Sequence, residues 1–360
     1  MNSPSTQLTN PSVRKPLEIP LHVPLARRAE QGQPVELPQV AAPSLEGLSV
    51  TVPLPEGFSA EQVQERFQEL ARPYATERYR LPTEALAWGD EVLLNIVGYA
   101  QGRLIPFSVR THVWLTLEPE PMLPGFYETL CGHSPGTSLV VDVVLPSEYP
   151  LEALRGVPAR FLVDIQAARQ VTYPDPESPE FLEAFGRGGT LELAARLVEE
   201  QMKDEAAQML LAQAQQLVLH AVASRAQVEL PARLIDEEIR RRWGASEGRA
   251  LLELNFSDEE QEESLSGWLA DRATRDEVEQ RLRIALVLGA ICKRDGLALT
   301  PELVEELLRK EAAAAGLSMD EVADALRAEP QRLAQIDQVA WHLMTVDHVM
   351  RQVKVHFATA

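Results

Sequence analysis

The feature that most constrains this chain is a series of short β-type segments between residues 89 and 165. The segments EVLLNIVGY, THVWLTL, SLVVDVVL and ARFLVDI are rich in β-branched and aliphatic residues, and turns containing glycine or proline separate them. One short helical insert, PGFYETL, interrupts the series. Several strands that wrap one short helix indicate an α+β fold with a small antiparallel sheet.

A different pattern follows the strand-like series, because helical periodicity continues to the end of the chain. We expect Thr190 to cap a long helix, and Thr300 to begin another that ends at Gly316. Serine followed three residues later by glutamate, at Ser257 and at Ser318, predicts two capping boxes. This half of the chain is therefore predicted to be helical throughout, without an internal repeat.

Weaker signals lie elsewhere in the sequence. LSVTVPL (48–54) alternates like a strand, and Ser59 begins a capping box whose helix should end before Pro73. Pro231 is expected at the first position of a later helix. We divide the chain into a Pro-rich, extended or disordered lead, a strand with a linker helix, a strand-rich domain and a mostly helical domain, at residues 1–44, 45–88, 89–168 and 169–360.

Composition excludes several classes of function. The 360 residues contain 34 Lys and Arg against 54 Asp and Glu, a net charge of −20, which argues against a protein that binds nucleic acid phosphates. The sequence has no apolar run of 18 residues, so we expect no membrane partner. It has no Gly-x-x-x-x-Gly-Lys loop for a nucleotide, and its seven histidines show no metal-binding spacing. We therefore expect no cofactor.

The two cysteines, Cys131 and Cys292, are far apart and have no paired spacing. We interpret both as buried or half-buried thiols in a reducing cytoplasm. The first residues of the chain lack the apolar core of a secretory signal, which agrees with a cytoplasmic location.

The order of several motifs suggests a family. Met122–Thr137, MLPGFYETLCGHSPGT, has PGF before a helix and then GH-x-x-G, and P-x-E-Y and L-x-G-x-x-A-x-F follow. Together these resemble the FKBP-type prolyl isomerase domain of the trigger factor family. VELPARLIDEEIRRR and LALTPELVEELLRKEA resemble the helical arms of its chaperone domain. The similarity extends from about residue 45 to the C-terminus.

This resemblance implies a pocket rather than acid–base residues. An X-Pro bond isomerises slowly because amide resonance imposes a barrier of ~18–20 kcal/mol, and a dry apolar pocket favours the twisted amide over the planar one. Carried over to this sequence, Met122, Leu123 and Phe126 would form the pocket floor, with the Leu123 N–H holding the substrate carbonyl. Tyr149 would supply a hydroxyl at the rim, and Phe161 a wall.

The sequence departs from the family at several pocket positions. Ile96 stands on the first strand, where the family has an aromatic ring, and Ile105 and Val113 also replace rings with aliphatic groups. Two interpretations stay open. The altered pocket is either a working isomerase site, or Leu123, Phe126 and Phe161 are core residues of a retained scaffold.

The resemblance also implies that paired helical arms hold unfolded chains through scattered apolar contacts. The alternative for each of these residues is a place in a helix–helix core. The candidates are Met202, Met209, Leu251, Leu254, Phe256, Trp268, Met319 and Trp341. Gly244 and Gly248 interrupt one arm, either at a mobile apolar tip or at a tight turn between packed helices.

A further departure concerns the ribosome. The family docks there through an N-terminal domain with a Gly-Phe-Arg-x-Gly-Lys loop, whereas only about 45 residues precede the similarity and the sequence has no such loop. Ribosome docking by this route is not expected. The leading hypothesis is an ATP-independent chaperone that binds unfolded or nascent polypeptides. The alternatives are a peptidyl-prolyl isomerase and a dedicated adaptor or assembly factor for one protein partner.

Overall fold

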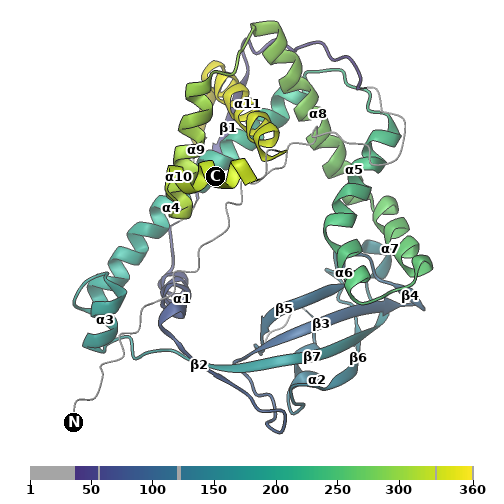
Figure 1. The fold of residues 1–360 in the computed structure, drawn as a ribbon, viewed down its shortest axis with the longest axis vertical. Coiled ribbons are helices and arrows are strands. Elements are labelled where there is room, and N and C mark those ends of the chain that lie inside the picture. The colour runs from purple at the N-terminus through teal and green to yellow at the C-terminus, as the bar shows by residue number, and fades with distance from the viewer. Residues whose placement is uncertain (1–36, 56, 120–122, 329–330, 359–360) are drawn as a thin grey trace. The chain divides into compact units, whose positions relative to one another are not determined.

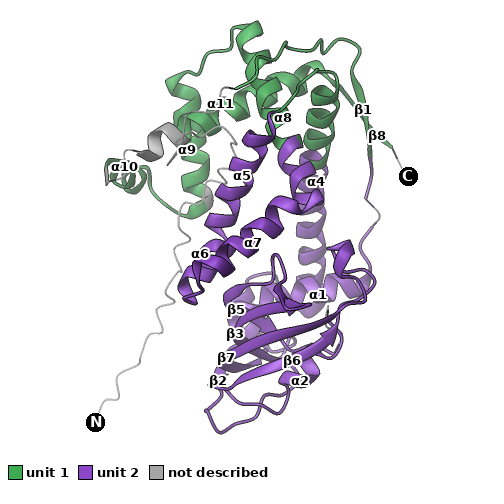
Figure 2. Cartoon of the chain, turned by 90° about the vertical axis from the view of Figure 1, so that its right-hand side faces the viewer, with its two compact units in different colours: residues 1–52, 213–230, 280–358 green, residues 53–212, 231–279, 359–360 purple. Residues whose placement is uncertain are grey.

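The computed structural model describes residues 37–55, 57–119, 123–328 and 331–358. They form two compact units, each assembled from separate stretches of the chain (Figure 2). Unit 1 comprises the described parts of 1–52, 213–230 and 280–358, and unit 2 comprises those of 53–212 and 231–279. The sequence analysis divided the chain into consecutive segments, so the units cut across the predicted domains.

The centre of unit 2 is an antiparallel sheet with one short helix, α2 (Phe126–Leu130), packed against it (Figure 1). β7 is the longest strand and pairs with β2, β3 and β6, while β3 also pairs with β4 and β5. This arrangement confirms the predicted α+β class. The strands are β2 (Thr76–Tyr79), β3 (Asp90–Ala100), β4 (Arg103–Leu104), β5 (Arg110–Thr116), β6 (Ser138–Val144) and β7 (Pro158–Thr172).

Two glycines explain how α2 fits beneath this sheet. Gly125 precedes α2 with a φ of 84°, a left-handed conformation that a side chain rarely adopts, and it turns the chain from Pro124 into the helix. At Gly98 on β3 a Cβ atom would lie 2.6 Å from the Phe161 ring. The absence of a side chain there lets the Phe161 ring lie against β3 and meet Phe126 on α2.

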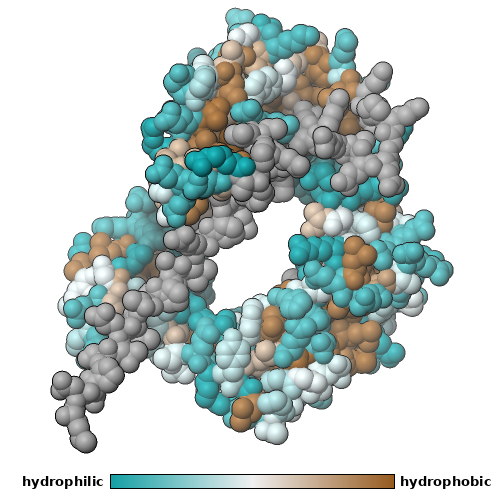
Figure 3. Space-filling model, viewed as in Figure 1, coloured by the Kyte–Doolittle hydropathy of each residue, from teal (hydrophilic) through white to brown (hydrophobic). Residues whose placement is uncertain are grey.

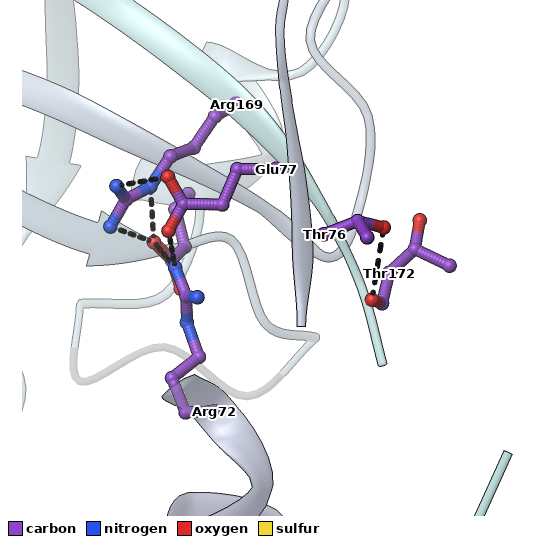
Figure 4. A network of polar contacts seen from close by, with 6 residues as sticks. Arg72, Thr76, Glu77, Arg169 and Thr172 are labelled. Atoms are coloured by element: carbon purple, nitrogen blue, oxygen red, sulfur yellow. Dashed lines mark hydrogen bonds and ion pairs between the residues drawn. The ribbon is translucent and has the colours of Figure 1, made fainter. Parts of the chain in front are cut away.

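A network of charges joins the sheet to the segment that precedes it. The helix α1 (Ala60–Ala71) runs into a 3-10 turn, η1 (Arg72–Tyr74), and the Arg72 guanidinium donates hydrogen bonds of 2.8 Å to Glu77 and Glu91. Arg169 on β7 binds the same two carboxylates (Figure 4). Hydrogen bonds from Arg72, followed by those from Arg169, lower the pKa of Glu91 although its burial opposes this. The network therefore fixes η1 on the sheet.

An aromatic cluster holds the helices next to this junction. Phe67 of α1 contacts Phe181 and Phe185 of α3 (Pro179–Phe185), with ring centroids 6.1 and 5.1 Å apart. The first half of α4 (Leu191–Ser224) packs on the same cluster through buried Ala194 and Val198. The α1, α3 and α4 helices therefore have a core separate from that of the sheet.

Three shorter helices complete unit 2. They are α5 (Ala232–Ala245), α6 (Glu247–Glu253) and α7 (Asp258–Ala270), and we call them the arm. Ser246 separates α5 from α6 with φ −125° and ψ −98°, and a Cβ atom on Gly248 would lie 2.9 Å from the Trp243 ring. The predicted break at these glycines is therefore a tight turn between packed helices.

Unit 1 is built around the second half of α4 and most of α8 (Arg272–Asp295). Its apolar core combines residues from the start, middle and end of the chain, among them Leu48, Val218, Ile291 and Val349. The other elements are α9 (Pro301–Ala315), α10 (Met319–Ala328), α11 (Gln331–Gln352) and a two-stranded sheet of β1 (Ser49–Pro53) and β8 (Lys354–Ala358).

Most of the predicted helix starts are confirmed. The capping boxes at Ser59, Ser257 and Ser318 are present, with side-chain and backbone bonds in both directions. Thr190 and Thr300 also cap their helices through backbone N–H groups three residues on. Pro231 lies one position earlier than predicted, at the N-cap of α5.

Three strands were missed: β2, β8 and the two-residue strand β4. We predicted helix to the C-terminus, which is wrong, because β8 ends the described chain and pairs with β1 through a bond from the Lys354 N–H to the Leu48 carbonyl. β2 is also a strand, and all four of its residues are exposed. β2 and β8 are short, largely exposed edge strands whose pairing partners lie far away in sequence, so local periodicity does not reveal them.

Three further features of the described residues concern membrane-spanning helices, metal sites and thiols. None of the helices among them is long and apolar enough to span a membrane. Within the same residues, no three His, Cys, Asp or Glu side chains gather in a way that suits a metal ion. Cys131 is half-buried and Cys292 is buried, both as free thiols, which agrees with the prediction.

Candidate peptide-binding sites

The first candidate site lies between α2 and the sheet of unit 2. The Phe126 and Phe161 rings meet edge to face with centroids 5.5 Å apart, and Ile96 and Ile105 complete the same buried cluster. Each of these four side chains is less than 10% exposed. The Ile96 and Ile105 side chains therefore pack with the Phe126 and Phe161 rings, and the four together form a closely packed apolar wall.

The rim of this cluster is more open. Leu123 and Tyr149 are half-buried and pack against it, and the Tyr149 carbonyl accepts a hydrogen bond of 2.8 Å from Arg155. Burial raises the pKa of the Tyr149 hydroxyl, and the negative charge of Glu247 adds to this effect. Tyr149 thus stays protonated and able to donate at neutral pH. Met122, the other predicted floor residue, lies outside the described residues.

The arm packs against the sheet beside this rim. Glu247 of α6 is only 4% exposed, and its carboxylate accepts hydrogen bonds from the backbone N–H groups of Phe107 and Val109 at 3.1 and 3.0 Å. It also accepts from the Ser264 hydroxyl and from the Trp268 indole N–H, both on α7. One buried charge therefore holds together α6, α7 and the loop after β4, and its lone pairs are satisfied by four donors.

Apolar contacts surround that carboxylate. The Phe107 and Trp268 rings lie 4.3 Å apart, and Val97, Leu104 and Val109 form a buried cluster with Ala250 and Leu251 of α6. Leu254 and Phe256 are half-buried against the same cluster. We call the residues that α6, α7 and the turn between them contribute to this contact the arm face. They are Glu247, Ala250, Leu251, Leu254, Phe256, Ser264 and Trp268.

A second apolar site lies in unit 1, between α8 and α11. It is a cavity of about 290 Å³ lined mostly by carbon, with Leu288 on α8 and Trp341 and His342 on α11. Burial lowers the pKa of His342, so its imidazole is neutral at pH 7. Figure 3 shows hydrophobic side chains gathered over α9 and α11 on this unit. The remaining lining residues are Ala285, Leu299, Asp337 and Gln338.

Comparisons with known sequences match both the sheet of unit 2 and the helical part of the chain. A sequence model of the bacterial trigger factor protein C-terminus matches residues 190–350. The trigger factor of Shewanella woodyi is 27% identical over 347 residues, which cover 94% of this chain and 76% of the relative. The trigger factor of Psychromonas ingrahamii is 26% identical over 319 residues, which cover 88% of this chain and 71% of the relative.

The chain is thus similar in sequence to trigger factors over most of its length. A third relative, the trigger factor of Granulibacter bethesdensis, is 27% identical over 323 residues, 89% of this chain and 70% of its own length. A solved structure from work titled "Promiscuous Substrate Recognition in Folding and Assembly Activities of the Trigger Factor Chaperone" aligns at a TM-score of 0.33 and 16% identity, over 88% of this chain and 73% of that chain. Because that score is low, the likeness to trigger factors rests on the sequences alone.

The predicted client contacts of this trigger factor homologue occupy different environments. Met209 on α4 is 73% exposed and Met319 on α10 is 36% exposed, whereas Met202 is buried in the aromatic cluster of α1 and α3. Trp341 lines the α8–α11 cavity. Leu251, Leu254, Phe256 and Trp268 all belong to the arm face.

Sequence reasoning missed the two residues that organise the arm face, Glu247 and Phe107. Glu247 stands in a stretch of charged and small residues, ASEGR, that is typical of an exposed turn. Its burial depends on a loop about 140 positions away, so no local pattern indicates it. Phe107 follows Ile105-Pro106, which the sequence analysis considered only as a pocket variation.

Proposed function

We propose that this protein is an ATP-independent chaperone that binds unfolded or nascent polypeptides and assists their folding. The observation that carries the proposal is the alignment with trigger factors over 88–94% of the chain, which includes the isomerase-like sheet as well as the helical units. An adaptor for a single partner is less well supported, because the family resemblance is not confined to one surface.

The α8–α11 cavity supplies a physical basis for this function. Its walls are apolar, His342 is uncharged, and its volume suits one or two client side chains. Burying one large apolar side chain contributes about 1.5–3 kcal/mol, so one such contact is weak and several are needed for useful affinity. Exposed apolar groups on α4, such as Met209 and Leu211, offer further contacts of this kind. Binding through many weak contacts tolerates diverse sequences and releases them readily.

The test is a panel of unrelated proteins that aggregate when diluted from denaturant. We expect the full chain to suppress the aggregation of most of them, equally well with and without ATP. Suppression of none of the panel would contradict the chaperone proposal. Suppression of only one related group of clients would support the dedicated adaptor instead.

Isomerase activity is a second candidate, and the observation in its favour is that Leu123, Phe126, Tyr149 and Phe161 gather in one cluster, as in an FKBP-type pocket. A protease-coupled assay on a peptide with a cis proline measures it directly. Acceleration that disappears in Phe126→Leu, with the fold kept, would support a working pocket. A rate equal to the uncatalysed one would support a retained scaffold.

We also propose a cytoplasmic location and no stable docking on the ribosome. The free thiols of Cys131 and Cys292 support the former. The net charge of −20 supports the latter, because it disfavours binding to the phosphates of ribosomal RNA. Co-sedimentation with ribosomes at physiological salt would contradict the second part.

A further inference from the structure

The small sheet of unit 1 has an unpaired edge. It consists of β1 and β8, and no third strand among the described residues pairs with β8 (Figure 2). Because the Lys354 N–H donates to the Leu48 carbonyl on the β1 side, the N–H and C=O groups of Val355 and Phe357 point away from β1. A two-stranded sheet is marginally stable by itself, and its free edge is a template for another extended segment.

The side chains along this edge are apolar and only partly covered. Val355 is half-buried on the core of unit 1, and Phe357 lies two positions further along β8, so both side chains point to the same face of the sheet. Phe357 is nevertheless 45% exposed. The edge therefore suits a segment that supplies backbone bonds to β8 and apolar side chains on the core face.

A segment with this pattern lies before the described residues. Residues 16–25, PLEIPLHVPL, have proline at positions 16, 20 and 24 and an aliphatic residue at every odd position from 17 to 25. Alternate residues of a strand direct their N–H groups to one edge and their side chains to one face. The odd positions thus combine a complete set of N–H groups with one apolar face, whereas the even positions lack three N–H groups.

The spacing of the prolines favours a strand over a polyproline II helix. A polyproline II helix repeats every three residues, so prolines four positions apart would point in different directions. In a strand all three prolines lie along one edge, which is tolerated where that edge faces solvent. The sequence of this segment is therefore suited to the outermost strand of a sheet, which pairs on one side only.

We infer that residues 16–25 add to the free edge of β8 as an antiparallel third strand, so that this edge is an interaction surface for the chain's own N-terminal segment. In direct antiparallel pairs both side chains lie on the same face, so the aliphatic residues of the segment cover Phe357 on the core side. The prolines lie on the opposite edge and block pairing with a further strand. This pairing is independent of the proposed chaperone function.

Two properties favour this segment over a second copy of the protein. Leu37 is half-buried on the same core cluster as Val355, and residues 26–36 join it to the segment. These eleven residues span about 36 Å when extended, which is the width of a small domain, so the tether keeps the segment concentrated near β8. Two copies of a chain with a net charge of −20 repel each other, whereas residues 14–28 contain four basic side chains and one acidic one.

The test removes N–H groups from one edge of the segment at a time. Ile19→Pro with Val23→Pro removes two from the pairing edge, and position 19 or 23 belongs to every pair of neighbouring odd positions from 17 to 25. Glu18→Pro with His22→Pro removes two from the proline edge and is the matched control. We expect the Val355 and Phe357 amides of the full chain to exchange at least about tenfold faster in the first double variant than in wild type or the control, as measured by NMR.

A second pair of double variants addresses the side chains. Ile19→Lys with Val23→Lys keeps both N–H groups but places charges on the core face, so it should also release β8, whereas Glu18→Lys with His22→Lys should not. The Lys354 amide is the internal reference, because its bond to Leu48 should keep it protected in every folded variant.

Four outcomes would overturn the inference. The first is fast exchange of the Val355 and Phe357 amides in wild type, and the second is equal protection in wild type and in Ile19→Pro with Val23→Pro. The third is loss of protection in the control as well, which would contradict pairing through the odd positions. The fourth is protection that rises with protein concentration, which would assign the edge of β8 to a second copy.

Discussion

The arm face and the α8–α11 cavity are two apolar surfaces on helices of one chain, and they differ in what covers them. On the arm face, Leu251 is fully buried and Glu247 has four hydrogen-bond donors. In the α8–α11 cavity, Trp341 is half-buried, and the Gln338 side-chain oxygen is buried with no hydrogen-bond partner among the described residues. Apolar side chains therefore form a buried core on the arm face and the open wall of a cavity between α8 and α11.

The difference shows that the exposure of an apolar helix surface depends on which other segment of the chain packs on it. Residues 104–109 cover the apolar groups of the arm face, so mutations there should affect stability. The α8–α11 cavity has no such segment in the described chain, so mutations there should affect binding with little change in stability. The predictions below test this contrast.

The largest effect should come from neighbouring leucines on α6. Leu251→Ala leaves a cavity in the arm-face cluster and should lower the free energy of unfolding by about 2–5 kcal/mol. Leu252→Ala is the matched control, because Leu252 is 63% exposed on the same helix, and it should change stability by less than about 0.5 kcal/mol. Denaturant unfolding measures both, and equal effects would show that the arm face is not a core.

The next effect concerns the carboxylates of the same helix. Glu247→Ala leaves the N–H groups of Phe107 and Val109 without their acceptor and should cost about 2–3 kcal/mol. Glu253→Ala removes an exposed carboxylate that accepts hydrogen bonds from Thr111 and Arg249, and should destabilise the protein much less than Glu247→Ala does. Hydrogen exchange at residues 107 and 109 would report the loss directly. Unchanged protection in Glu247→Ala would contradict the role of this side chain.

A smaller effect is expected for the α8–α11 cavity. Trp341→Ala should weaken the binding of an unfolded client about threefold to tenfold and leave the unfolding midpoint almost unchanged, because Trp341 lines an open cavity. Leu343→Ala provides the control on the same helix, since Leu343 is exposed and does not line the cavity. A large loss of stability in Trp341→Ala would mean that the cavity is part of the core of unit 1.

The smallest effect should be a pH dependence in unit 1. Because burial lowers the pKa of His342 in the folded state, the unfolded chain binds a proton first as the pH falls through its ordinary value of about 6.5. The stability contributed by neutral His342 is thus fully present above pH 6.5 and decreases below it. Thermal unfolding from pH 7.5 to 5.5 should show this decrease, and His342→Gln should reduce it. An identical slope in His342→Gln would assign the dependence to other groups.

The sequence predicted most elements of unit 2, except β2 and β4, because local signals define them. Alternation marked β3, β5, β6 and β7, Gly125 marked the start of α2, and serine caps marked α1 and α7. These signals operate within a few residues of the feature that they predict. The likeness of PGFYETL to an isomerase helix also placed Phe126 and Phe161 in one cluster, where they are found.

The features that the sequence did not predict depend on contacts between segments that are far apart in the chain. Neither β8, which pairs with β1, nor the arm face, where residues 104–109 meet 247–268, has a local signature. Met202 and Met209 illustrate the same limit, since both lie on one helix and only the packing of α1 and α3 makes the first buried and the second exposed. Side chains of one type in one pattern do not reveal which of them will be covered.

The composition of unit 1 has a consequence for how the protein is made. Its core joins residues near position 48 with others at 218, 291 and 349, and its small sheet needs strands from both ends of the described chain. During synthesis the early segments must wait until nearly the whole polypeptide has emerged before they meet their partners. The protein thus passes through a prolonged unfinished stage, in which the apolar faces of its first-made helices stay exposed to aggregation.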